Sequence, residues 1–238
     1  MSIVFPLLFI GHDASADSCP NLAFTSALAR ARKELPNPKA VLLLTCARVT
    51  QGARLNTFGS KKSHKALLED FKKNISGLPV SEDPELTLDP WSMRVLNLLL
   101  PDKDIPVHIM SIDHGLDPLT HYFLGKELKY LREKGILILA LGNIIHNPSA
   151  ASMECQAAPP TWASLFERKV RKHLKERNFM TLVDHFHLGP ESRLSITGSD
   201  HYLPLIYVLG AAGKQEPLRS LYEGFKNGTT SLKSFRIG

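Results

Sequence analysis

Polar side chains that could do chemistry stand next to the apolar segments of this 238-residue chain. His12 follows the first of these segments, His114 the third and His146 the fourth. A further histidine, His201, precedes the apolar run 202–205. Neutral imidazole is the commonest metal ligand in proteins and also a general base near neutral pH. The four histidines therefore indicate a metal site or a proton-transfer site, provided that the fold brings them to one place.

A single histidine after a strand usually makes hydrogen bonds within its own loop, so the interpretation depends on the joint pattern. Histidine-rich sites with an open position suit Zn(II) or non-haem Fe(II). His185 and His187 are also spaced like a ligand pair on one strand. Nothing else polar clearly converges on that pair, and we interpret it as structural.

Short apolar runs alternate with longer segments of helical periodicity, and these elements must position the histidines. The segment 40–46 is a continuous aliphatic run, which is typical of a strand covered on both faces. In the tail, Asn227-Gly228 stands between two alternating segments and predicts a β-hairpin. The predicted strands are 3–10, 40–46, 106–112 and 136–141, and the predicted helices are 21–35, 63–74, 91–100, 119–134, 162–177 and 201–211.

This order of elements predicts an α/β fold with a central, mostly parallel sheet, helices on both faces and a small C-terminal β-hairpin. Hydrophobic residues make up 43% of the chain and charged residues 22%, a composition that excludes a disordered chain. No stretch rich in Gly, Ser or Pro divides the sequence, so we expect one domain over residues 1–238. The carboxyl ends of parallel strands share one edge of the sheet, where sites form in open α/β folds.

The net charge of +6 and the basic run 167–177 raise the question of a nucleic-acid partner. Acidic residues interrupt that run and no aromatic residues are interleaved with the bases. Phe166, Val170 and Leu174 have helical spacing, which is typical of an amphipathic helix with a solvated basic side. We therefore do not expect a nucleic-acid partner.

The sequence also predicts a cellular compartment. No apolar stretch approaches the ~20 residues that a membrane span needs, and the N-terminus lacks the basic start of a signal peptide. The cysteines Cys19, Cys46 and Cys155 are few and include no CxxC pair. This pattern is typical of a reducing compartment without a disulfide framework. We expect a cytoplasmic protein without membrane association.

Several motifs carry a resemblance to a known family. The chain resembles the class III extradiol ring-cleavage dioxygenases with a LigB-type catalytic domain, in the branch related to DOPA 4,5-dioxygenase. The resemblance runs from end to end, and its most specific segments are 142–147 (GNIIHN) and 201–211 (HYLPLIYVLGA). The other matching segments are 9–13 (FIGHD), 38–44 (PKAVLLL), 104–106 (DIP), 111–113 (SID) and 234–238 (SFRIG).

The resemblance implies a metal-dependent enzyme that opens catechol rings beside the hydroxyls with O2. The implied partners are a small aromatic, catechol-type substrate and O2, and a homo-oligomer stays open. His12, His146 and His201 match metal-site histidines of this branch, and the implied metal is Zn(II) or Fe(II). A nearby histidine would exchange protons with the catechol, and His114 is the candidate for this catalytic role.

Two departures from the family pattern bear on activity. The family places a ligand histidine where this chain has Ala47, and an acid/base histidine where it has Pro90. Strand alternation directs the adjacent Cys46 to the opposite face, and His64 lies beyond a rearranged segment. Because alanine cannot bind a metal and proline cannot carry a proton, we expect weak metal binding and impaired catalysis.

Two hypotheses about function follow. The first is an extradiol aromatic ring-opening dioxygenase, an oxidoreductase, with an altered metal site. The alternative is a catalytically degenerate family member that acts as a binding or partner subunit. Metal content and turnover of catechols separate the two.

Overall fold

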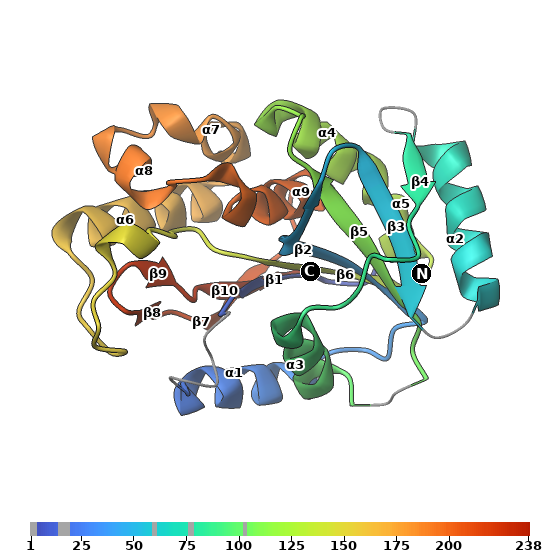
Figure 1. The fold of residues 1–238 in the computed structure, drawn as a ribbon, viewed down its shortest axis with the longest axis horizontal. Helices are drawn as coiled ribbons and strands as arrows, with labels where there is room; N and C mark the ends of the chain where they lie inside the picture. The colour runs from blue at the N-terminus through green and yellow to red at the C-terminus, as the bar shows by residue number, and fades with distance from the viewer. Residues whose placement is uncertain (1–3, 14–19, 59–60, 76–78, 102–103) are drawn as a thin grey trace.

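The computed structural model describes residues 4–13, 20–58, 61–75, 79–101 and 104–238, and within them eight strands form one central sheet (Figure 1). These strands are β1 (Leu7–Gly11), β2 (Ala40–Thr50), β3 (Ala53–Phe58), β4 (Val80–Glu82), β5 (Val107–Asp113), β6 (Ile136–Gly142), β7 (Leu218–Tyr222) and β10 (Ser234–Ile237). Their order across the sheet is β4-β3-β5-β2-β6-β1-β10-β7. The inner strands β5, β2, β6 and β1 run parallel, whereas β3 joins β5 and β10 joins β1 in antiparallel pairing. The predicted α/β fold with a mostly parallel sheet is confirmed.

Helices cover both faces of the sheet, as the sequence predicts (Figure 1). On one face, α1 (Leu22–Arg32) and α3 (Pro90–Leu99) pack Phe24 and Trp91 into a core that includes Ile10. The larger core on the opposite face draws its side chains from six helices. These are α2 (Lys61–Asn74), α4 (Pro118–Leu128), α5 (Tyr130–Glu133), α6 (Thr161–Glu176), α7 (Phe179–Val183) and α9 (Leu203–Ala211).

Side chains alternate along the inner strands as a sheet buried on both sides requires. Leu8 and Ile10 of β1 join the core on the side of α1 and α3, and Leu7 and Phe9 join the opposite core. All four side chains are fully buried. Because both faces of such a strand are apolar, the strand appears in the sequence as a continuous hydrophobic run.

The structure differs from the sequence prediction at helix 119–134 and at the edge of the sheet, among other places. The predicted helix 119–134 is two helices, because the chain is interrupted at Lys129 between α4 and α5. Leu124, Leu128 and Leu131 nevertheless all face the core, as their spacing predicts. Strands β3 and β4 were not predicted, because β3 lies toward the sheet edge and is half-buried at four of its six positions. Such a strand lacks the continuous apolar run of an inner one.

The predicted C-terminal hairpin is present. Strands β8 (Phe225–Lys226) and β9 (Thr230–Ser231) pair antiparallel around Asn227 and Gly228, whose φ angles are 51° and 72°. Asparagine and glycine adopt this left-handed region more readily than other residues. The turn chemistry of two residues therefore fixes the position of the hairpin.

Helix α6 carries the basic run, and it has the predicted amphipathic form. Phe166, Val170 and Leu174 are buried, whereas Arg168 and Lys172 are exposed. The basic residues thus form the solvated side of a helix that is anchored by its apolar side. Within the described residues, the helices are all too short or too polar to cross a membrane.

The state of the cysteines differs in part from the prediction. Cys46 is a free thiol, but Cys155 is disulfide-bonded. The expectation of reduced cysteines is therefore wrong for Cys155, because sequence spacing does not show which cysteines meet in space. The cytoplasmic location stays a prediction.

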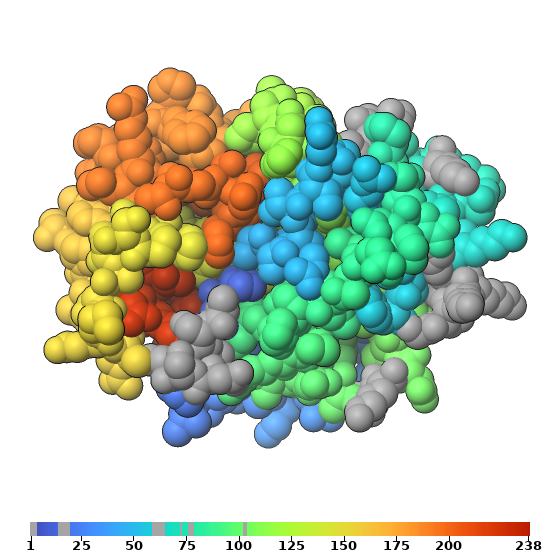
Figure 2. All heavy atoms as spheres, viewed as in Figure 1, coloured from blue at the N-terminus to red at the C-terminus, as the bar shows by residue number. Residues whose placement is uncertain are grey.

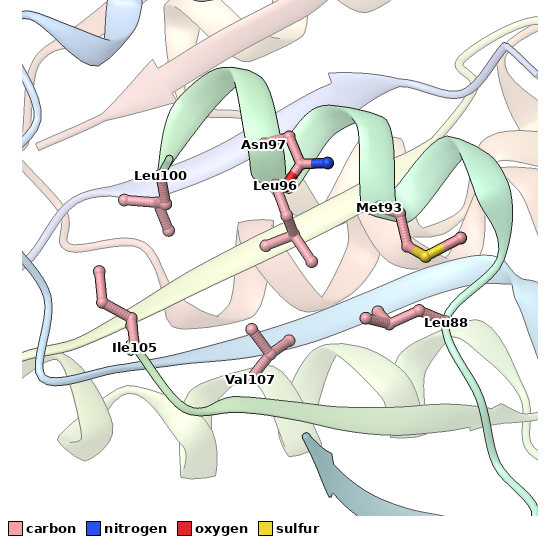
Figure 3. A pocket seen from close by; sticks show the side chains of 7 residues that line it. All are labelled: Leu88, Met93, Leu96, Asn97, Leu100, Ile105 and Val107. Carbon is pink, nitrogen blue, oxygen red and sulfur yellow. The ribbon is translucent and has the colours of Figure 1, made fainter. Parts of the chain in front are cut away.

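An apolar groove of about 250 Å³ lies between α3 and the region of β5 (Figure 3). None of the four candidate histidines lines it, and Asn97 is the one polar side chain among its described lining residues. The groove therefore supplies no group for the chemistry that the histidines indicate. Its lining residues are Leu88, Met93, Leu96, Asn97, Leu100, Ile105 and Val107.

A buried histidine away from the sheet edge makes stability sensitive to acid. His121 of α4 is fully buried, and its Nδ1 lies 2.9 Å from the Tyr207 hydroxyl of α9. Burial lowers the pKa of His121 from 6.5 to about 4. Between pH 6.5 and pH 4, His121 is protonated in the unfolded chain but stays neutral in the folded protein. The free energy of unfolding therefore falls as the pH drops toward 4. The shift corresponds to on the order of 3 kcal/mol.

We expect His121→Gln to reduce this loss of stability, measured as the free energy of urea unfolding at pH 7 and at pH 4.5. The matched control is His114→Gln, because His114 is exposed and should leave the difference between the two pH values as in the wild type. An equal acid sensitivity in the wild type and in His121→Gln would contradict the assignment.

Candidate functional site

The candidate site lies at the carboxyl ends of β1, β6 and β2, which are neighbours in the sheet. His12 follows β1 directly, and Cys46 lies one residue beyond the last β2–β6 pair, Thr45–Leu141. His201 ends the short helix η3 (Ser199–His201), which leads into α9. Figure 2 shows this face of the molecule, where dark-blue atoms of the N-terminal segment emerge between light-blue, orange and yellow segments. Residues far apart in sequence therefore meet at one edge.

A glycine at the end of β6 permits this approach. A Cβ on Gly142 would lie 2.4 Å from the backbone carbonyl oxygen of His201. This is closer than any real Cβ contact, so a larger residue would push the η3 segment away from the sheet. The first glycine of the GNIIHN segment thus has a steric role in bringing His201 to the strand ends.

The structure brings His12, His146 and His201 together, as the sequence predicts. The ring centroids of His12 and His201 are 5.8 Å apart, at an angle of 80° between the ring planes. The rings of His146 and His201 stack with centroids 3.6 Å apart and planes within 16° of parallel. His12 is buried, and the other two are half-buried.

The stacking of His146 on His201 limits their roles. The lone pair of an imidazole nitrogen lies in the ring plane, and a zinc ion would lie about 2.0–2.1 Å from that nitrogen. Two nearly parallel rings separated by a stacking distance have no common in-plane point. One ion therefore cannot accept both lone pairs unless one ring turns. In this geometry the two rings cannot both bind one ion.

Cys46 faces the histidines, and this corrects the expectation from strand alternation. One ligand atom from each of His12, Cys46 and His201 lies within 4.8 Å of the others, close enough for a shared metal ion. The pairing of β2 with β5 slips between Leu44 and Val49, so four β2 residues fall opposite a single β5 residue. The site lies on the strand face that Cys46 shares with Leu44, and Leu44 belongs to the core that includes Tyr202, the residue after His201.

Asn143 connects two of the histidines. Its amide nitrogen donates to the carbonyl oxygens of His12 and Ser231, both at 2.9 Å. Its Oδ1 therefore faces Nδ1 of His201, 2.7 Å away, and Nδ1 must be the donor. A neutral His201 then carries its proton on Nδ1 and leaves the Nε2 lone pair free. Such hydrogen bonds orient metal-binding histidines.

A carboxylate stands behind His12. Asp89 caps the N-terminus of α3 by accepting from the backbone N–H and the hydroxyl of Ser92. Its Oδ1 lies 3.8 Å from Nε2 of His12, which is too long for a hydrogen bond but close enough for electrostatic attraction. Burial alone would raise the pKa of Asp89, but His12 and the Ser92 groups outweigh it and hold that pKa below its usual value.

His146, His201 and the Cys46 thiol are neutral in this environment. Burial, together with His146 and His12, lowers the pKa of His201 to about 3. Burial and the neighbouring His12 also lower the pKa of His146. Burial raises the pKa of the Cys46 thiol, and the carboxylates of Asp89 and Asp200 raise it further. Neutral imidazoles are the form in which histidine binds a metal.

A buried ion pair supports the first strand end. Nζ of Lys226, in β8, lies 2.6 Å from Oδ1 of Asp13, the residue after His12. Both side chains are at most 5% exposed. The C-terminal hairpin is therefore fastened next to the site, a contact that the sequence analysis missed because nothing in the sequence links positions 213 residues apart.

Residues 59–234 match the family described as the catalytic LigB subunit of aromatic ring-opening dioxygenase. The chain belongs to the LigB family. It is 28% identical to a 4,5-DOPA dioxygenase extradiol of Escherichia coli K12, over 98% of this chain and 94% of that protein. It is 26% identical to a protein of the same description from Beta vulgaris, over 96% and 95% of the two chains. A crystal structure of an uncharacterized protein from Escherichia coli K12 is 30% identical, covers 98% of this chain and 100% of that one, and superposes with a TM-score of 0.87.

These findings confirm that the protein is class III extradiol dioxygenase-like, and the predicted departures can now be placed within the LigB fold. Ala47 is half-buried and has no ligand atom in its side chain, whereas the Sγ of the preceding Cys46 lies within 4.8 Å of ligand atoms of His12 and His201. Pro90 is the first residue of α3, directly after the Asp89 cap. The signal for Asp89 was present in the sequence, since Asp before Pro is a common helix start.

The remaining histidine candidates of this LigB-family chain lie apart from the cluster. His114 is exposed just beyond β5 and has no ring contact with the cluster among the described residues. His64 lies in α2, and its side chain falls outside the described part of the structure. His185 is buried against Tyr202, and His187 is exposed and bonded to Asp184. Their surroundings agree with the structural interpretation of the pair 185 and 187.

Proposed function

We propose that this protein is a metal-dependent extradiol dioxygenase that opens catechol-type rings, with its metal held by His12 and His201 at the carboxyl edge of the sheet. The observation that supports it is the convergence of imidazoles from three separate segments in a chain of the LigB family. His12 Nε2 is a buried nitrogen without a hydrogen-bond partner among the described residues, which fits a ligand atom.

The residues of the site have different roles in metal binding, ring orientation and proton transfer. A bound Zn(II) or Fe(II) ion would bring the catechol oxygens and O2 into one geometry. Asn143 holds the His201 ring with Nε2 unprotonated. His146 is half-buried beside His201, and its imidazole is placed to take a proton from a catechol hydroxyl and return it later. We therefore propose His146 as the proton-transfer group and not as a ligand.

One feature favours the alternative, a degenerate member that acts as a binding or partner subunit. Pro90 occupies the place of a family acid/base histidine, and no proton can be carried there. The carboxylate of the neighbouring Asp89 accepts hydrogen bonds at the N-terminus of α3 and does not replace that histidine. The alternative therefore predicts that the protein binds a metal without turning over catechols.

The test is oxygen uptake with DOPA and simple catechols after anaerobic reloading of the stripped protein with Fe(II) or Zn(II). We expect metal-dependent uptake in the wild type, and loss of both metal and uptake in His201→Ala. In His146→Gln we expect retained metal with uptake reduced by about 10²–10⁴-fold, the usual contribution of general acid–base catalysis.

His114→Gln is the comparison for the catalytic role, because the sequence assigns that role to His114. A larger loss of uptake in His114→Gln than in His146→Gln would overturn the role proposed for His146. Metal binding without any uptake by the wild type would overturn the dioxygenase and support the partner-subunit alternative.

A further inference from the structure

Cys46 is a buried sulfur at the point where two imidazoles meet. Its side chain is 7% exposed, and its Sγ lies within 4.8 Å of ligand atoms of both His12 and His201. No other trio of His, Cys, Asp or Glu in the described part of the chain meets this criterion. The sulfur thus occupies the position that a third metal ligand would need.

We infer that Cys46 is itself the third protein ligand, so that the metal is bound by two imidazoles and one thiolate. This rests on the proposed function in placing a metal at this edge, but not on ring opening. As the sulfur–metal bond forms, the thiol proton passes to solvent and the ligand becomes the thiolate. The sulfur would take the place of the side chain that Ala47 lacks.

A second observation points independently to a ligand. The His12 side chain is 7% exposed, and its Nε2 has no hydrogen-bond partner among the described residues. A buried polar atom without a partner costs free energy, and a metal ion would satisfy it. Asp89, 3.8 Å from this nitrogen, adds a negative charge that favours a cation over a second neutral donor.

The donor set has a consequence for the metal. Two histidines and a carboxylate with open positions are typical of non-haem Fe(II) oxygenases, whereas soft thiolate ligands favour zinc. A site with two imidazoles and a thiolate should therefore prefer Zn²⁺, and its spectroscopic substitute Co²⁺, to Fe²⁺. It should also bind more tightly than a site with an alanine in the third position.

The experiment is anaerobic titration of the stripped full-length protein with Co²⁺. We expect one equivalent to bind in the wild type, with a sulfur-to-cobalt charge-transfer band in the near ultraviolet. Cys46→Ser should lose this band and bind Co²⁺ at least about 10–100-fold more weakly, the range that damage to a metal site commonly produces. Thr45→Ser, one residue earlier on the same strand, is the matched control and should keep both band and affinity.

A measurement on the wild type tests the role of Cys46 even if the Cys46→Ser variant does not fold. X-ray absorption of the zinc-loaded protein should show one sulfur at about 2.3 Å together with nitrogen at about 2.0–2.1 Å. Co²⁺ or Zn²⁺ bound without sulfur would overturn the role of Cys46 and leave the proposed function standing. Failure of the wild type to bind any metal would overturn both.

Discussion

Replacing Asn143 by alanine is expected to weaken metal binding by about 10–100-fold, although Asn143 is not a ligand. The amide fixes His201 by accepting from its Nδ1 at 2.7 Å, and it holds the His12 backbone by donating to its carbonyl oxygen at 2.9 Å. Without the amide, His201 can carry its proton on Nε2, the nitrogen that should face the metal. The measurement is a competition titration with Zn²⁺ against a chelator of known affinity.

A metal-free measurement separates this effect from a general loss of stability. Long-range ¹H–¹⁵N spectra should show the His201 proton on Nδ1 in the wild type and a mixture of tautomers in Asn143→Ala. The matched control is Asn147→Ala, because Asn147 is also buried and bonded to a backbone carbonyl, that of Leu194, but its side chain forms no hydrogen bond with any of the three rings among the described residues. If both variants lower metal affinity equally, Asn143 has no specific role in positioning His201.

The inner part of the fold could be predicted from the sequence because its strands are buried on both faces. Segments 40–46 and 136–141 are continuous apolar runs, and they lie in β2 and β6, the neighbours at the centre of the sheet. The edge could not be predicted in this way. Strand β3 is half-buried at most positions, so its side chains need not be apolar and no periodic signal marks it.

The location of the site could be predicted from the sequence, but the contacts among its side chains could not. Histidines after strand ends predict convergence, because parallel strands bring their carboxyl ends together, and the rings of His12, His146 and His201 do meet. The choice between Cys46 and Ala47 depends on which face of β2 lies against η3 and α9, and the sequence does not show that. The face-to-face stacking of His146 likewise depends on where η3 lies, and only the fold determines that.

Breaking the Lys226–Asp13 pair is expected to be the most destabilising single change among those considered. The two side chains are 5% and 3% exposed, and their charged atoms lie 2.6 Å apart. Lys226→Met removes the ammonium group from beside the buried Asp13 carboxylate, and breaking a buried ion pair typically costs about 3–5 kcal/mol. The measurement is the free energy of urea unfolding at neutral pH. Because Asp13 follows His12 directly, we also expect weaker Zn²⁺ binding in the variant that remains folded.

The double variant Asp13→Asn/Lys226→Met tests the cause. Removing both charges also removes the buried carboxylate that the single variant leaves in place, so most of the lost stability should return, as is common when a buried pair is replaced as a whole. Arg219→Met is the control for losing a cation, because its pair with Glu34 is exposed, with 65% and 62% of the side chains accessible. Exposed pairs contribute about 0–1 kcal/mol. A double variant as unstable as Lys226→Met would show that the packing of the lysine chain, rather than the ion pair with Asp13, holds the hairpin beside His12.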